Sequence, residues 1–134
     1  MKYIKKIKKS IFYLKYNFLR KFRNIFNINQ LLNIDGKELI LPPDHLLSLY
    51  NMNYPNYDKF LPNQLKKLNK LDIIDIGANV GDTLIRILSD NNNYYCIEPN
   101  EYFLKYLKIN VNRNLDKYKN IKIKIIDDLV GDQL

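Results

Sequence analysis

The sequence predicts an α/β fold in which parallel strands alternate with helices. Three apolar segments of strand length alternate with two helical patterns, in the order 71–76, 82–89, 94–98, 101–112 and 121–125. The first segment is apolar apart from its aspartates, as in a central strand buried on both faces. The third segment alternates isoleucine with lysine, which suits a sheet edge. Right-handed crossovers then give a βαβαβ unit with strand order 3-2-1.

Residues 1–30 predict a basic amphipathic helix. Apolar residues recur every three or four positions, at Ile4, Ile7, Ile11, Leu14, Phe18, Phe22 and Ile25. Lys15 interrupts the apolar run, so no transmembrane span fits, and no apolar core with small cleavage-site residues indicates a signal peptide. We expect this stripe to pack on the domain. Two alternatives stay open: residues 1–28 lie on an anionic membrane, or they bind RNA.

Residues 31–70 form a connecting region. A turn at Asp35 and Gly36 precedes a short predicted strand, residues 37–41, which two prolines stop. A helix is expected from residue 58 or 63 to residue 69. His45 is the single histidine and lies in a proline-rich loop without an assignable carboxylate partner, so we interpret it as structural.

Residues 71–134 carry the most informative motif. An apolar strand ends at Asp75, and a turn containing Gly77, Ala78, Asn79 and Gly81 leads into a helix. Glycines permit backbone angles and close approaches that side chains forbid, and a helix that starts past them directs backbone N–H groups toward a ligand. Glu98 ends the next strand, 21 residues after Gly77, near the spacing at which an acid reaches ribose hydroxyls. The layout predicts a nucleoside site.

The turn departs from the dinucleotide fingerprint, because Asn79 stands where the second glycine is required. An ionised Asp75 would repel a pyrophosphate but attract an ammonium group. S-adenosylmethionine (SAM) has no phosphate, carries an amino group and a sulfonium, and keeps a ribose. Asp75 and Glu98 therefore favour SAM over NAD or FAD, and a dinucleotide oxidoreductase is the weaker alternative.

The motif resembles the FkbM-type methyltransferases, a branch of the Rossmann-like SAM-dependent enzymes. The matching segments are residues 74–83, residues 96–100, the helix that leads to Asn110, and the upstream stretches 41–45 and 54–62. The resemblance implies methyl transfer from SAM, commonly to an oxygen of a sugar or another small metabolite.

The resemblance also implies the site residues. Asp75, Gly77, Ala78, Asn79 and Gly81 would line the methionine and ribose end of SAM, and Glu98 would hold the ribose hydroxyls. Asp127 or Asp128, after the third strand, would contact the adenine. We assign no catalytic base.

The distribution of charge and the cysteine count limit the kinds of partner and site that we expect. Residues 1–30 carry nine Lys or Arg and no acid, whereas the other residues carry 13 basic and 14 acidic groups. This balance argues against nucleic acid as the substrate of the catalytic part, and we expect a small-molecule acceptor. Cys96 is the single cysteine, so no intrachain disulfide forms, and no Cys/His spacing indicates a metal site. We expect a cytoplasmic protein, with attachment at the inner membrane face as the alternative.

The sequence stops just after the third predicted strand. A methyltransferase of the resembled family needs about four more strands beyond the first one, so we expect a truncated N-terminal half that binds SAM weakly. The exposed sheet edge would favour homo-oligomers, and the strand at residues 37–41 would cover part of it. The alternative function is a non-catalytic module that binds a nucleoside or a partner at a membrane surface.

Overall fold

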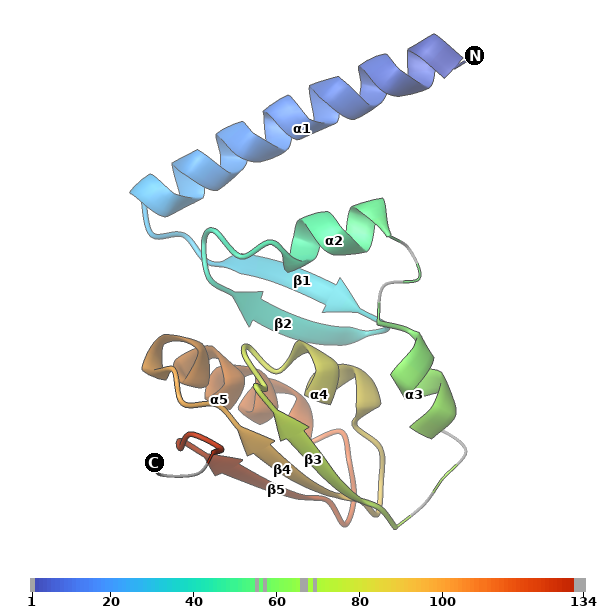
Figure 1. Ribbon diagram of the computed structural model, residues 1–134, viewed down its shortest axis with the longest axis vertical. Helices are drawn as coiled ribbons and strands as arrows, with labels where there is room; N and C mark the ends of the chain where they lie inside the picture. Colours follow the sequence, from blue (N-terminus) through green and yellow to red (C-terminus); the bar gives the residue numbers. More distant parts are fainter. Residues whose placement is uncertain (1, 55, 57, 66–67, 69, 132–134) are drawn as a thin grey trace.

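The structure is a computed structural model that describes residues 2–54, 56, 58–65, 68 and 70–131. Helices α4 and α5 lie between a hairpin, β1-β2, and a sheet, β3-β4-β5 (Figure 1). The strands are β1 (Gln30–Ile34), β2 (Lys37–Leu41), β3 (Asp72–Ile76), β4 (Asn93–Ile97) and β5 (Lys122–Ile126). The helices are α1 (Lys2–Ile25), α2 (Leu47–Asn53), α3 (Phe60–Leu65), α4 (Asp82–Ile87) and α5 (Glu101–Leu115).

The three-stranded sheet confirms the predicted unit. Its strands are parallel, and β4 lies between β3 and β5. Both crossover helices cover the same face, because two right-handed crossovers in one direction place them there. The opposite face is left bare over Ile74, Ile76 and Tyr95, which are exposed.

The core fills the space between the hairpin and the sheet. Its fully buried side chains come from all three layers: Leu39 and Leu41 from β2, Leu84, Ile85 and Leu107 from the helices, and Tyr94 and Cys96 from β4. Helices α4 and α5 therefore bury the apolar faces that their sequence patterns predict, and the hairpin adds a cover that the βαβαβ unit alone lacks.

Side chains also tie the hairpin to the two central helices. Lys37 Nζ donates to the carbonyl oxygens of Ile85, Arg86 and Leu88, at 2.7, 3.2 and 3.2 Å, and so satisfies the end of α4. Asn110, fully buried on α5, pairs with β2: the Ile40 amide donates to its Oδ1 at 2.6 Å, and its Nδ2 donates to the Ile40 carbonyl at 3.0 Å.

The termini of α4 and α5 differ slightly from expectation. Asn100 caps α5 as predicted, since its Oδ1 accepts the Tyr102 amide at 2.9 Å. The helix runs to Leu115 rather than to residue 112, because Asn114 is buried and donates to the Glu38 carbonyl at 2.8 Å. Helix α4 is shorter than predicted and ends at Ile87.

The connecting region contains two elements that the sequence patterns did not predict, β1 and α2. Gln30 begins β1, and its Nε2 lies 3.0, 3.1 and 2.8 Å from the carbonyl oxygens of Pro42, Pro43 and His45. This buried amide holds the loop that follows β2. The strand predicted over residues 37–41 is present as β2, and α3 occupies Phe60–Leu65 of the helix predicted to reach residue 69. Residues 66, 67 and 69 lie outside the described residues.

Two structural expectations are wrong. Strand β2 pairs with β1 and packs on α5 and α4, so it does not cover the open edge of β3, which has no strand partner among the described residues. The apolar stripe of α1 does not pack on the domain either: Ile11, Leu14 and Phe18 are 60%, 71% and 70% exposed. Helix α1 contacts the domain through Tyr16 instead, which lies on the other side of the helix, is buried, and donates a hydrogen bond to the His45 carbonyl. Among the residues that the structure describes, none of the helices combines the length and the hydrophobicity of a membrane-spanning segment.

Candidate functional site

The turn between β3 and α4 lies at the carboxyl end of the sheet and is closed by its own hydrogen bonds. The amides of Gly77 and Ala78 both donate to the Ile97 carbonyl of β4, at 2.9 and 3.0 Å. The Gly81 amide donates to the Ala78 carbonyl at 2.8 Å. Gly77, Asn79 and Gly81 all have left-handed backbone angles, with φ of 77°, 49° and 83°. Glycine and asparagine tolerate this region best, which explains their places in the motif.

The two remaining amides of the turn are also bonded within the protein. The Asn79 amide donates to Glu98 Oε2 at 2.7 Å, and the Val80 amide donates to Asn79 Oδ1 at 2.8 Å. All five consecutive amides of residues 77–81 therefore have protein acceptors. The turn does not offer them as a cradle for a phosphate group.

Gly81 also allows the turn to press against α5. A Cβ atom at this position would lie 2.7 Å from Leu107 Cδ1, and Leu107 is fully buried. The carbonyl of Val80 accepts the Nδ2 of Asn110 at 2.8 Å. Helix α5 thus holds the turn in addition to β4.

Glu98 joins the end of β4 to the turn. Its side chain is buried, and its Oε1 accepts the Asn100 amide at 2.9 Å while its Oε2 accepts the Asn79 amide at 2.7 Å. Each carboxylate oxygen can accept more than one hydrogen bond. Glu98 therefore has a structural role in the loop and retains acceptor capacity toward a hydroxyl donor.

Asp75 is a half-buried carboxylate with one buried, unsatisfied oxygen. Its Oδ2 is inaccessible to solvent and has no hydrogen-bond partner among the described residues. Burial raises the pKa of Asp75, and the nearby carboxylates of Asp82 and Asp58 raise it further. A cationic donor at this place would relieve both effects, because it would satisfy the oxygen and offset the like charges.

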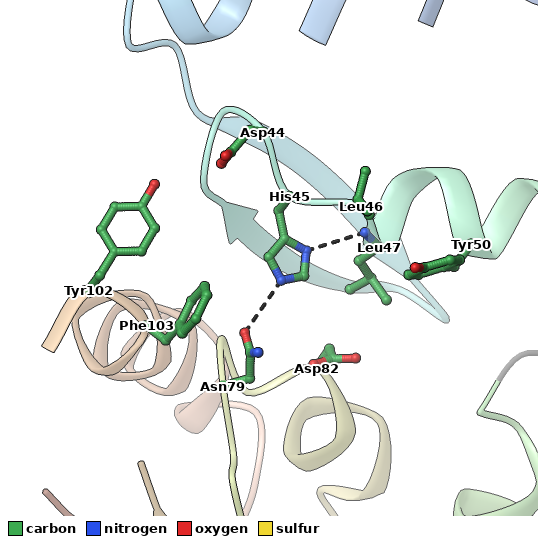
Figure 2. Close-up of a pocket in the computed structure, with 9 residues that line it drawn as sticks. All are labelled: Asp44, His45, Leu46, Leu47, Tyr50, Asn79, Asp82, Tyr102 and Phe103. Carbon is green, nitrogen blue, oxygen red and sulfur yellow. Dashed lines mark hydrogen bonds between the residues drawn. The ribbon is translucent and has the colours of Figure 1, made fainter. Parts of the chain in front are cut away.

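A cavity of about 480 Å³ adjoins the turn (Figure 2). Its polar and aromatic lining includes Asp44, His45, Asn79, Asp82, Tyr102 and Phe103. Asn79 and Asp82 belong to the turn and to the start of α4, so they connect the motif to the cavity. Asp75, Gly77 and Glu98 do not line it.

His45 positions the wall of this cavity. Its Nδ1 accepts the Leu47 amide at 3.2 Å, so Nε2 carries the proton and donates to Asn79 Oδ1 at 3.4 Å (Figure 2). Its ring meets Phe103 edge-on, with centroids 6.3 Å apart. Burial raises the pKa of Asp82, a shift opposed by the hydrogen bond from its own backbone amide and by the positive charge of Arg86. The predicted structural role of His45 agrees with these contacts, and the residue also faces the cavity.

Asp127 lies at the same edge of the sheet. The Glu98 amide donates to the carbonyl of Ile126 at 3.0 Å, so the exposed Asp127 directly follows the residue paired with Glu98. Asp128 instead uses its Oδ1 to accept the Leu129 amide at 2.8 Å. Of the two adjacent aspartates, Asp127 is the one next to the motif.

The structure thus places the predicted residues of the turn, Glu98 and Asp127 along one edge, with Asp75 beneath it. Four residues that line the cavity were not predicted from the sequence: Asp44, Asp82, Tyr102 and Phe103. The helical pattern of residues 101–112 carried a signal for the last two, since both fall in the first turn after Asn100. Pro55 and Tyr57 of the upstream segment lie outside the described residues.

Comparisons with known proteins bear on the fold. No family model and no curated protein matches the chain. The crystal structure of the M. jannaschii tRNA m1G37 methyltransferase is similar, with a TM-score of 0.50 and 20% identity over 78% of this chain and 30% of that chain. M. jannaschii TYW2, solved in complex with AdoMet, gives a TM-score of 0.47 and 17% identity over 75% of this chain and 44% of that one.

At this level of identity the first likeness shows the fold alone. The chain has an α/β fold with a parallel three-stranded sheet, as the sequence predicted, and this fold is similar to that of the M. jannaschii tRNA m1G37 methyltransferase. It spans less than half the length of either solved structure. The narrower FkbM resemblance has no support from these comparisons and stays a proposal.

Proposed function

We propose that this chain is the cofactor-binding half of a SAM-dependent methyltransferase. The observation that carries the proposal is the hydrogen bonding of the turn. All five amides of residues 77–81 already have acceptors in the protein. A pyrophosphate needs such amides as donors, whereas SAM has no phosphate and does not need them.

The charges around the turn support the same choice. Asp75 presents a buried oxygen that lacks a partner among the described residues, and Asp82 and Asp58 add negative charge nearby. A ligand with a positive charge fits this surrounding, and a ligand with two negative phosphates does not.

Each acidic residue near the turn would bind a different part of SAM. We assign Asp75 to the ammonium of SAM and the remaining acceptor capacity of Glu98 to the ribose hydroxyls. We assign Asp127, which directly follows β5, to the adenine amino group. Gly77 has nothing within 4 Å of a Cβ built on it, so the surface above it is open to the ligand.

SAM, when bound, supplies a methyl group on a positively charged sulfur for transfer to a nucleophile. The chain would contribute by holding the two reactants in line, which accounts for much of the rate of such reactions. The cavity beside Asn79 is the candidate place for the acceptor, because Asn79 and Asp82 connect it to the turn.

We propose a small hydroxylated acceptor, such as a sugar. Aromatic faces at Tyr102 and Phe103 and acceptor groups at Asp44 and Asp82 suit the apolar faces and hydroxyls of a sugar. The same carboxylates would repel a polyanion, which disfavours a nucleic-acid acceptor in this cavity.

The bare face and open edge of β3 support the proposal that the three strands are half of a larger sheet. In the described residues, Ile74 and Ile76 are 65% and 63% exposed and β3 lacks a partner on one side. Further strands beyond β3 would cover both and would supply the rest of the pocket.

A calorimetric titration with SAM, S-adenosylhomocysteine and NAD tests the proposal. We expect weak binding of SAM, weaker binding of S-adenosylhomocysteine because it lacks the sulfonium charge, and no binding of NAD. Binding of NAD alone would instead indicate a dinucleotide enzyme. Binding of none of the three would favour the non-catalytic module.

A further inference from the structure

Helix α1 exposes a continuous apolar surface, which we call the outer stripe. It consists of Ile7, Ile11, Leu14, Phe18, Phe22 and Ile25, whose exposed fractions run from 44% to 77%. At 100° per residue these six positions fall within an arc of about 80° on one side of the helix. A narrow apolar stripe of this length is typical of an amphipathic helix that buries one face against another apolar surface.

The stripe faces away from the domain. Tyr16 lies on the opposite side of α1, is 6% exposed, and donates its hydroxyl to the His45 carbonyl at 3.3 Å. Arg23 lies over the ring of Tyr16, with its Cζ 6.0 Å from the ring centroid. These contacts set the rotation of the helix, so the outer stripe faces away from the domain and stays exposed. Figure 1 shows α1 running along the outside of the domain, beyond β1 and α2.

The charges next to the stripe are all of one sign. Residues 1–30 contain nine Lys or Arg and no acid. Lys15 and Lys21 are exposed and flank the outer stripe on its two sides. The partner that covers the stripe must therefore be both apolar and negatively charged at its rim.

We propose that the outer stripe docks on the surface of an anionic lipid bilayer. The apolar residues would enter the boundary between headgroups and acyl chains, while Lys15 and Lys21 would meet the anionic headgroups. In this arrangement the domain sits behind α1, on the side of Tyr16, and is directed away from the bilayer. The proposal does not depend on the identity of the nucleoside.

The other occupants fit the same observations less well. A second copy of α1 would bring 18 positive charges together (nine on each helix) with no acid on either helix to pair across the seam. An RNA would use the charges but would leave the apolar stripe in water. A bilayer surface satisfies both features at once.

Vesicle co-sedimentation of the full chain tests the proposal. We expect binding to vesicles of phosphatidylcholine mixed with phosphatidylglycerol, little binding to pure phosphatidylcholine, and a loss of binding at high salt. Replacing Leu14→Gln and Phe18→Gln together should weaken binding at least about tenfold, because two buried apolar side chains are lost. Glutamine keeps the helix propensity, which circular dichroism checks.

A matched control removes two equally exposed apolar residues elsewhere. Leu31→Gln with Phe60→Gln changes positions that are 66% and 76% exposed, and it should bind vesicles like the unmodified chain. Equal loss in both double variants would overturn the proposal. Equal binding to neutral and anionic vesicles would overturn it as well, and so would a chain that binds no vesicles but forms dimers that Leu14→Gln and Phe18→Gln dissolve.

Discussion

Two glycines of the turn are required for different reasons. Gly81 has φ of 83° and sits against Leu107, so both the backbone angle and the packing exclude a side chain. Gly77 has φ of 77° but faces open space. Only the backbone angle constrains Gly77 in the unliganded protein, and its missing side chain keeps a surface open where we place the nucleoside.

Gly77→Ala and Gly36→Ala form a matched pair that separates strain from binding. Gly36, in the turn between β1 and β2, has φ of 78° and also faces open space. Each substitution should cost about 1–2 kcal/mol of stability, because alanine is strained at these angles. Calorimetry should show that Gly77→Ala abolishes SAM binding while Gly36→Ala retains it; equal affinities in the two variants would remove Gly77 from the site.

Asp75→Asn should stabilise the chain and weaken SAM binding. Burial raises the pKa of Asp75 above its usual 3.8, so the folded state loses stability as pH rises through that raised pKa, and an uncharged Asn does not. Urea unfolding at neutral pH should therefore give a higher midpoint for Asp75→Asn. The lost charge-assisted hydrogen bond, about 1.5–3 kcal/mol, should weaken SAM binding tenfold or more.

The pH dependence of the unmodified chain follows from the same residue. Its SAM affinity should fall as pH drops toward the raised pKa, because protonated Asp75 cannot pair with an ammonium. Asp72→Asn, on the same strand but exposed, is the control and should keep the affinity. A variant Asp75→Asn with full affinity for SAM would contradict the assignment.

At the scale of structural elements, Asn110 of α5 connects its helix to the hairpin and to the glycine turn. Its side chain bonds both backbone groups of Ile40 in β2 and the carbonyl of Val80 in the glycine turn, at distances from 2.6 to 3.0 Å. The hairpin, α5 and the turn are thus fixed relative to one another by one buried amide.

Asn110→Ala should destabilise the chain by about 2–4 kcal/mol, since one buried and two partly buried backbone groups lose a partner. The exposed Asn112 on the same helix offers the control, and Asn112→Ala should change the unfolding free energy in urea by less than about 0.5 kcal/mol. If both variants unfold at the same urea concentration, Asn110 does not brace the turn.

The elements that sequence patterns predicted are those with a periodicity of their own. The strands of the sheet, α4, α5 and β2 each follow an alternating, apolar or helical pattern. Strand β1 and helix α2 do not, because they depend on distant contacts such as that of Gln30 with the Pro42 carbonyl. The orientation of α1 was not predicted for the same reason. Its apolar stripe does not indicate whether the domain or another partner covers it, and the contact of Tyr16 with the His45 carbonyl determines which side of the helix faces the domain.

The candidate site also has a part that local sequence patterns predicted and a part that depends on long-range contacts. The motif placed Gly77, Asn79, Glu98 and Asp75 at one edge, since the carboxyl ends of parallel strands meet there. The internal bonding of the turn amides and the cavity formed with His45 are long-range features, set by Glu98 and Gln30. No local pattern carries them.

The whole molecule leaves one side of its sheet uncovered. Ile74 and Ile76 are exposed, and the edge of β3 has no partner strand in the described part of the chain. We expect sedimentation velocity to show association that increases with concentration, because open edges and apolar faces pair with one another.

Ile74→Lys with Ile76→Lys should reduce this association. Leu31→Lys with Met52→Lys adds the same charge at exposed apolar positions of β1 and α2 and should leave it unchanged. A chain that stays monomeric at every concentration would show that the bare face needs no cover.

The central claim is that the turn after β3 seats a positively charged sulfur nucleoside. Amide chemical shifts of the isotopically labelled chain during titration with SAM test it most directly. We predict that the resonances of Gly77, Asn79, Gly81 and Glu98 shift together while that of Gly36 does not. Shifts confined to other segments, or none at saturating SAM, would contradict the claim.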